Sequence, residues 1–189
     1  MTRRLIVALL ATLAAGCGDA FRDPQIEALG GEFPGTAPSQ FHRPGQPCVL
    51  CHDSYEGAEP ELSIGGTLFF FPPDSAGFPV TSGGFVVSIV DSKGKSFNAE
   101  VNCFGNFSVE KAVFDPAYPI LAEVLQRDED TGELRTNAPM SSRIGRDGSC
   151  ASCHIDPKSW LSPGPVFVNG APDDFEPPSP SGPCAEAFQ

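Results

Sequence analysis

Basic side chains are scarce in this 189-residue chain, which has 12 Lys and Arg against 24 Asp and Glu. Binding to nucleic-acid phosphates needs a basic face, so this balance argues against a nucleic-acid partner. The acidic excess is typical of exported proteins, in which the net charge keeps the protein soluble. It would also attract a basic redox partner protein over long range.

Long apolar segments and helical patterns are missing as well. No apolar run reaches the roughly 20 residues that a membrane-spanning helix needs. The 20 Gly and 20 Pro exceed average usage and break helix interiors, which argues against a helical bundle. We therefore expect one compact unit that is mainly β, with many loops and little helix.

The first residues have the layout of a secretory signal. Arg3 and Arg4 precede an apolar stretch over 5–15, and small residues lead to Cys17. The end of this stretch resembles the lipobox of bacterial lipoproteins, which implies a signal peptide over 1–16 and acylation of Cys17. The mature chain would then be a lipoprotein anchored to a bacterial membrane and facing the periplasm or the cell surface. An ordinary cleaved signal is the alternative, and the arginine pair lacks the rest of a twin-arginine motif.

Four of the seven cysteines lie in two CxxCH motifs, which are Cys48-Val49-Leu50-Cys51-His52 and Cys150-Ala151-Ser152-Cys153-His154. This pattern is the attachment signature of c-type haem. Two thiols at this spacing reach the two vinyl groups of one porphyrin edge, and the adjacent histidine reaches the iron. A zinc site or a redox dithiol is a poorer explanation for two copies in an exported chain. The sequence therefore predicts two covalently bound haem c groups, with His52 and His154 as proximal iron ligands.

Few side chains remain for the second face of each iron. Haem iron in electron carriers is usually capped by His or Met, and only His42 and Met140 are left besides the initiator. The simplest assignment pairs His42 with the first haem and Met140 with the second. A crossed assignment fits the spacing equally well. Met ligation would give the second haem the higher potential.

The segment between the motifs has the pattern of β-strands. Apolar and β-branched residues form runs over 64–71, 85–90, 99–109 and 120–125, and a turn is expected at Asp91 to Lys95. Three glycine-containing stretches, at Gly66-Thr67-Leu68, Gly83 to Val90 and Gly105-Asn106-Phe107, resemble the small β-sandwich found beside carboxypeptidases and in bacterial surface proteins. This resemblance implies an Ig-like or prealbumin-like sandwich and no particular activity.

The order of these parts is similar to that of uncharacterised bacterial dihaem lipoproteins. We expect a linker over 17–40, a first haem-binding segment over 41–61, the sandwich over 62–127, a second haem-binding segment over 128–169 and a Pro-rich tail over 170–189. Cys103 and Cys184 remain, and in an oxidising compartment a disulfide between them is the simplest expectation. Two separate buried thiols are the alternative.

Electron transfer is the function that these residues favour, because every reactive group is used as a haem linker or an iron ligand. The chain would be an electron carrier and not an enzyme. A small haem peroxidase would need an iron with one open face. In a third hypothesis, the sandwich is a surface-binding module that the haems regulate.

Overall fold

The structure is a computed structural model that describes residues 19–31, 39–55, 57–69, 84–102, 104–128, 130–155 and 159–168. The chain consists of two compact units, and the boundary between them follows Gly31. In the first, α2 (Arg22–Ala28) lies within the expected linker, and Asp19 Oδ1 accepts the N–H groups of Phe21 and Arg22 at its start. No helix in the described part of the chain has the length and apolar character needed to cross a membrane.

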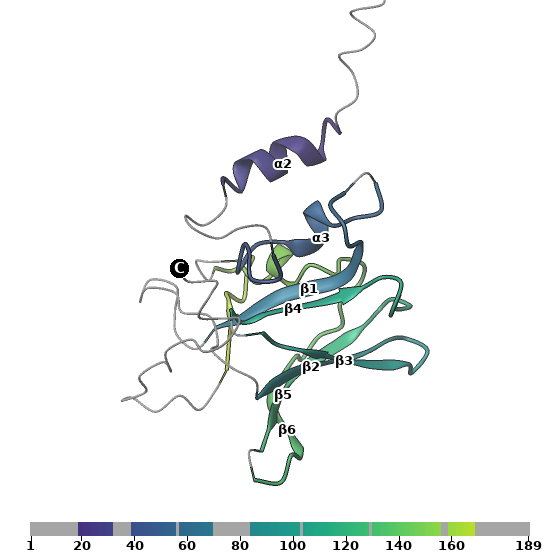
Figure 1. Cartoon of the computed structure of the whole chain (residues 1–189), viewed down its shortest axis with the longest axis vertical. Coiled ribbons are helices and arrows are strands. Elements are labelled where there is room, and N and C mark those ends of the chain that lie inside the picture. The colour runs from purple at the N-terminus through teal and green to yellow at the C-terminus, as the bar shows by residue number, and fades with distance from the viewer. Residues whose placement is uncertain are drawn as a thin grey trace, which may run out of the picture. The chain divides into compact units, whose positions relative to one another are not determined.

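The second unit is mainly β, as expected, and holds two sheets. Figure 1 shows β1 and β4 above the strands of the other sheet. The three-stranded sheet has the order β4-β1-β7, and the four-stranded sheet has the order β3-β2-β5-β6. The strands are β1 (Leu62–Phe69), β2 (Phe85–Val90), β3 (Ser96–Glu100), β4 (Asn106–Glu110), β5 (Leu121–Arg127), β6 (Leu134–Pro139) and β7 (Val166–Phe167).

Both sheets contribute to one apolar core. In β2, Phe85, Val87 and Ile89 alternate toward this core, as the period-two pattern of a strand requires. The two sheets therefore enclose one layer of apolar side chains, in the manner of a sandwich. The main core residues are Ile64, Leu68, Phe85, Val87, Ile89, Phe107, Val109, Phe114, Ile120 and Val124.

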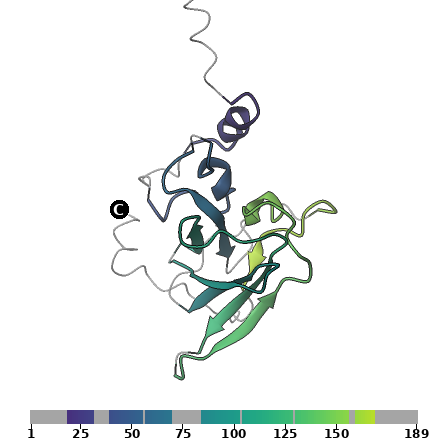
Figure 2. The same cartoon turned by 90° about the vertical axis from the view of Figure 1, so that its right-hand side faces the viewer.

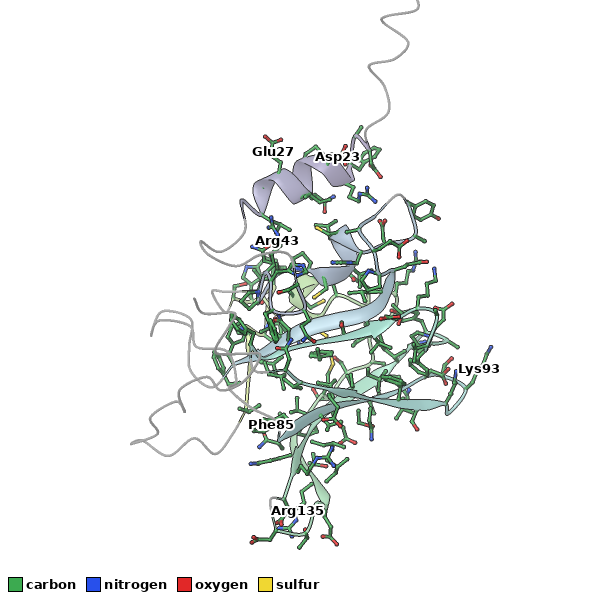
Figure 3. All side chains as sticks on the ribbon, in the orientation of Figure 1. Asp23, Glu27, Arg43, Phe85, Lys93 and Arg135 are labelled. Atoms are coloured by element: carbon green, nitrogen blue, oxygen red, sulfur yellow. The ribbon has the colours of Figure 1, made fainter. Side chains whose placement is uncertain are left out.

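The hairpin between β2 and β3 confirms the predicted turn at Asp91 to Lys95. Asp91 Oδ1 accepts the N–H groups of Lys93 at 2.8 Å and Lys95 at 2.9 Å, and its Oδ2 accepts the N–H of Ala117. Gly94 takes the left-handed conformation that the turn needs, with φ of 79°. In Figure 3, Lys93 and Arg135 mark the tips of this hairpin and of the β5–β6 hairpin, away from the CxxCH motifs.

Two strands, β6 and β7, were not expected in the segment assigned to the second haem. β6 lies in the segment assigned to the second haem, and it pairs antiparallel with β5 from Arg127↔Leu134 to Glu123↔Pro139. Its sequence, Leu-Arg-Thr-Asn-Ala-Pro, is polar because it forms an edge of the sheet with little to bury. The β region therefore extends beyond the expected boundary at residue 127, to residue 139 in β6 and to residue 167 in β7.

β1 is covered on both faces. Residues 64–68 are all buried, whereas a strand with one solvated face would alternate. One face of β1 contributes to the core, and α3 (Cys48–Cys51) covers part of the other. Figure 2 shows α3 next to β1 from a second direction. The strand thus provides a common support for parts of the chain that precede and follow the sheets.

Candidate haem-binding site

The first CxxCH motif folds as a single helical turn. α3 begins after Pro47, whose backbone is extended, and the N–H of His52 donates to the Cys48 carbonyl oxygen at 3.0 Å. Residues three apart on such a turn share a face. Cys48 and Cys51 therefore lie on one side, as attachment to one porphyrin edge requires.

The second motif adopts nearly the same turn. The 3-10 helix η2 (Cys150–Ser152) contains its first cysteine, and the N–H of His154 donates to the Cys150 carbonyl oxygen at 2.9 Å. Two segments that are about 100 residues apart thus build the same local structure from the same five-residue pattern.

The motif histidines are oriented through the same ring nitrogen. Nδ1 of His52 lies 3.0 Å from the Ala58 carbonyl oxygen and 2.9 Å from that of Pro60, and Nδ1 of His154 lies 2.8 Å from the Gly164 carbonyl oxygen. A carbonyl can only accept, so Nδ1 carries the proton in both rings. Within the described residues Nε2 makes no hydrogen bond, which leaves its lone pair available. Metal-binding histidines in proteins are usually held in this way.

Two glycines of β1 hold the motifs close together. A Cβ on Gly65 would lie 2.8 Å from Cβ of Cys48, and a Cβ on Gly66 would lie 2.8 Å from Cβ of Cys150. Successive residues of a strand point to opposite faces, so the cysteines contact β1 from opposite sides. Figure 3 shows sulfur atoms gathered around α3 and β1. Any side chain larger than hydrogen at these two positions would displace a motif.

A hydrogen bond joins the two motifs directly. Ser149 is buried, and its Oγ accepts the N–H of Val49 in α3 at 2.9 Å. Ser149 pairs with Gly65 in a parallel bridge, and the N–H of Gly65 donates to the Gly148 carbonyl oxygen at 2.9 Å. The chain just before the second motif is therefore fixed to both β1 and the first motif.

Burial changes the acidity of the two leading cysteines. Cys48 and Cys150 are half-buried as residues, but their side chains face β1, and Cys150 packs against the apolar core. Loss of solvent raises the pKa of Cys48 to about 11 and that of Cys150 to about 12. Cys153, at the other end of the second motif, is exposed.

The chain after the second motif returns to the same edge of β1. β7 pairs in parallel with Leu68 and Phe69, three positions beyond the bridge at Gly65. The loop between them, of which residues 150–155 and 159–165 are described, thus has both ends on one strand. The hydroxyl of Ser162 fixes this loop internally, because it accepts the N–H groups of Ile155 at 2.9 Å and Gly164 at 3.1 Å and lies 2.8 Å from the carbonyl oxygen of Cys153.

Trp160 lies at the tip of this loop. The N–H and carbonyl groups of Ser159 and Ser162 pair with each other, so Trp160 and Leu161 form the turn between them. Trp160 is 92% exposed and Leu161 72% exposed. Sequence reasoning assigned Trp160 no role, and in the structure it is not a core residue.

The predicted distal ligands differ in their placement. The rings of His42 and His52 are 5.7 Å apart between centroids. Two imidazoles bound through metal–nitrogen bonds of about 2 Å on opposite sides of one ion would place their centroids roughly 6 Å apart. Nδ1 of His42 contacts the Ser39 carbonyl oxygen closely and the Ser39 N–H at 3.3 Å.

Met140 follows β6, and its N–H donates to the Ala122 carbonyl oxygen on β5 at 3.3 Å. It therefore belongs to the four-stranded sheet, whereas the loop that contains His154 is attached to the three-stranded sheet. Its pairing with the second haem stays a prediction. The predicted lipidation at Cys17 and the predicted disulfide between Cys103 and Cys184 lie outside the described residues.

Several residues that shape the site were missed by sequence reasoning. Gly66 was interpreted as part of a sandwich motif and Gly65 as part of the same strand, although a glycine pair inside a strand also signals the close approach of another chain segment. Ser149, Thr67 and Asn106 carry no comparable local signal, because their partners are distant in the sequence.

The motif residues fit a covalently attached haem better than an ion held by side chains alone. Across the described ranges, no three His, Cys, Asp or Glu side chains converge as the ligands of one metal ion would. Comparison of the chain with protein-family models, with curated proteins and with solved structures found no match.

Proposed function

We propose that this chain is a dihaem c-type cytochrome that transfers electrons. The observation that carries the proposal is the repeated geometry of the two CxxCH motifs. In each, two cysteines share one face of a helical turn, and a histidine is fixed through Nδ1 so that Nε2 is free to bind iron.

Cys48 and Cys51 would link the first haem, and Cys150 and Cys153 the second. Nε2 of His52 and of His154 would bind the two irons, with His42 as a further ligand of the first iron and Met140 as a further ligand of the second. Bound haem supplies an iron that alternates between the ferric and ferrous states, one electron at a time. The chain holds the imidazoles in one tautomer and one orientation through backbone carbonyl groups.

The distance between the motifs supports exchange between the two groups. A path from Cβ of Cys48 to Cβ of Cys150 runs through the two contacts with a Cβ placed on Gly65 and on Gly66 and through the backbone between these glycines. Consecutive Cα atoms are 3.8 Å apart and each added Cβ contributes one carbon–carbon bond, so the two cysteine Cβ atoms lie within roughly 12 Å of each other. Two haems attached at this separation would exchange electrons with each other within the protein.

The setting of this carrier follows from the first residues and from the charge. Acylation of Cys17 would anchor it to a membrane, on the periplasmic side or at the cell surface. Its excess of acidic residues would attract a basic redox partner. The two sheets around one core support a small Ig-like or prealbumin-like sandwich as the scaffold.

Intact-mass measurement of the exported protein tests this proposal. The wild-type protein should carry two haem masses and a lipid-modified Cys17. The variants C48A/C51A and C150A/C153A should each carry one haem mass. Redox titration of either variant should then detect a single redox centre. A wild-type mass without haem would refute the proposal, whatever the fold of the chain.

A small haem peroxidase is the second candidate. The observation in its favour is that Met140 is fixed in the sheet that does not hold the second motif, which would leave the second iron open if Met140 stays there. The ferric absorption spectrum separates the two functions. Two low-spin signals fit the carrier, and a high-spin signal that persists in C48A/C51A favours the peroxidase.

A further inference from the structure

His42 lies in a segment that is held firmly in place. Its ring faces the ring of His52, and the N–H groups of His42 and Gln46 donate to the Ser39 and Arg43 carbonyl oxygens at 3.1 and 3.2 Å. Arg43 has a φ of 50°, which is uncommon for a residue with a side chain and is found where surrounding contacts enforce it. The Arg43 side chain is labelled in Figure 3 near the start of this segment.

Two side chains from the sheet supply some of these contacts. Thr67 on β1 and Asn106 on β4 are register partners, and the Thr67 hydroxyl donates to Asn106 Oδ1 at 2.7 Å. Thr67 Oγ1 also accepts the N–H of Gly45 at 2.7 Å. Asn106 Nδ2 donates to the carbonyl oxygen of His42 itself at 3.0 Å. The pairing of β1 with β4 is thereby transmitted to the backbone at His42 and at Gly45, three residues later.

The same segment has an apolar anchor and a further hydrogen bond. Phe41 is buried, and its ring lies 5.4 Å from that of Phe104, between centroids. Asn102 Nδ2 donates to the Gln40 carbonyl oxygen at 2.7 Å. A histidine in a solvated loop would not be surrounded by contacts of this kind.

We propose that Thr67 and Asn106 are positioning residues that present His42 to the iron bound at His52. This inference rests on the proposed function, because it assumes a haem on the first motif. The carboxamide of Asn106 fixes the carbonyl group of His42 and the hydroxyl of Thr67 fixes Gly45 three residues later, so the sheet register sets how often His42 leaves the iron. The two residues are 15 and 54 positions after His52 and touch neither the iron nor the porphyrin in this role.

The rate at which an external ligand binds measures this role. Carbon monoxide or imidazole can reach the first iron only while His42 is detached, so the observed rate follows the detached fraction. T67V and N106L in the full-length holoprotein should each raise that rate roughly 2- to 10-fold, the effect expected for one hydrogen bond. T67S retains the hydroxyl and should restore the wild-type rate. N98L, the same change at an exposed position on β3, is the matched control.

H42A provides the reference for a first iron that is fully open. It should bind carbon monoxide without the delay caused by detachment, and added imidazole should return its low-spin spectrum. The proposal is overturned if H42A leaves both irons six-coordinate, or if T67V and N106L bind carbon monoxide at the wild-type rate. Intact mass is measured on every variant, so a missing haem would refute the proposed function and not be mistaken for a lost ligand. If N106L does not fold, the comparison of T67V with T67S decides the question alone.

Discussion

In the haem-free chain, the motif cysteines should react with a small disulfide reagent at very different rates. The thiolate is the reactive form, and burial raises the pKa of Cys150 to about 12. At pH 8 such a thiol is ionised in about one molecule in 10⁴, compared with about one in four for free cysteine. The greater nucleophilicity of a more basic thiolate recovers about 40-fold, so Cys150 should react roughly 60-fold more slowly than free cysteine.

The same reasoning gives roughly a 20-fold slower reaction for Cys48, whose pKa burial raises to about 11. Cys153 is exposed and should be modified first within the second motif. Peptide mass spectrometry over a time course would measure each rate, and the denatured chain, in which all rates should converge, is the control. The reasoning is refuted if Cys150 and Cys153 react at similar rates in a chain that retains its cooperative fold.

This prediction has a consequence for haem attachment. A thiol that faces β1 is not available to a vinyl group, so haem supplied to the folded haem-free chain should not become linked through Cys48 or Cys150. Attachment would have to precede closure of the motifs onto Gly65 and Gly66. Haem supplied during refolding should become linked to a much greater extent, which absorbance after acid extraction would quantify.

Three further changes test the structure around the site. G66A should destabilise the protein by about 1–3 kcal/mol in urea unfolding, because its Cβ would overlap Cys150, whereas G84A has open space and should have little effect. S149A should cost about 1–3 kcal/mol because it leaves a backbone N–H of α3 unpaired, and S152A, at an exposed position, is its control. For Asp91, burial raises the pKa of the carboxyl group, but the N–H groups that donate to its oxygens outweigh burial, so the pKa is lowered overall. The carboxylate therefore stabilises the fold above about pH 4, and this contribution is lost as the pH falls further. The difference between D91N and wild type in the urea midpoint should therefore shrink as the pH falls from 4 to 2, and a constant difference would contradict this.

The β-strands were predictable where the sequence alternates and where turns are marked. The apolar run over 85–90 and the glycine-containing turn after it correspond to β2 and its hairpin. Edge strand β6 was not predictable, because none of its six residues is buried and its pairing with β5 depends on tertiary contacts. The helix α2 was missed for a similar reason, since none of its residues is buried and it has no apolar stripe.

The candidate haem-binding site was likewise predictable only in its local parts. Each CxxCH motif carries its own local geometry, so the turn, the cysteine pair and the adjacent histidine were predictable from five residues. What brings the motifs together is not local. The glycine pair of β1 receives one motif on each face, and the bond from Ser149 to α3 spans 100 positions of sequence. Removing the side chains at two consecutive positions of a central strand creates room for close approach, at the cost of the packing that a strand normally supplies. A strand that stabilised only the sandwich would gain from larger residues there, so we infer that these two glycines serve the close approach of the motifs.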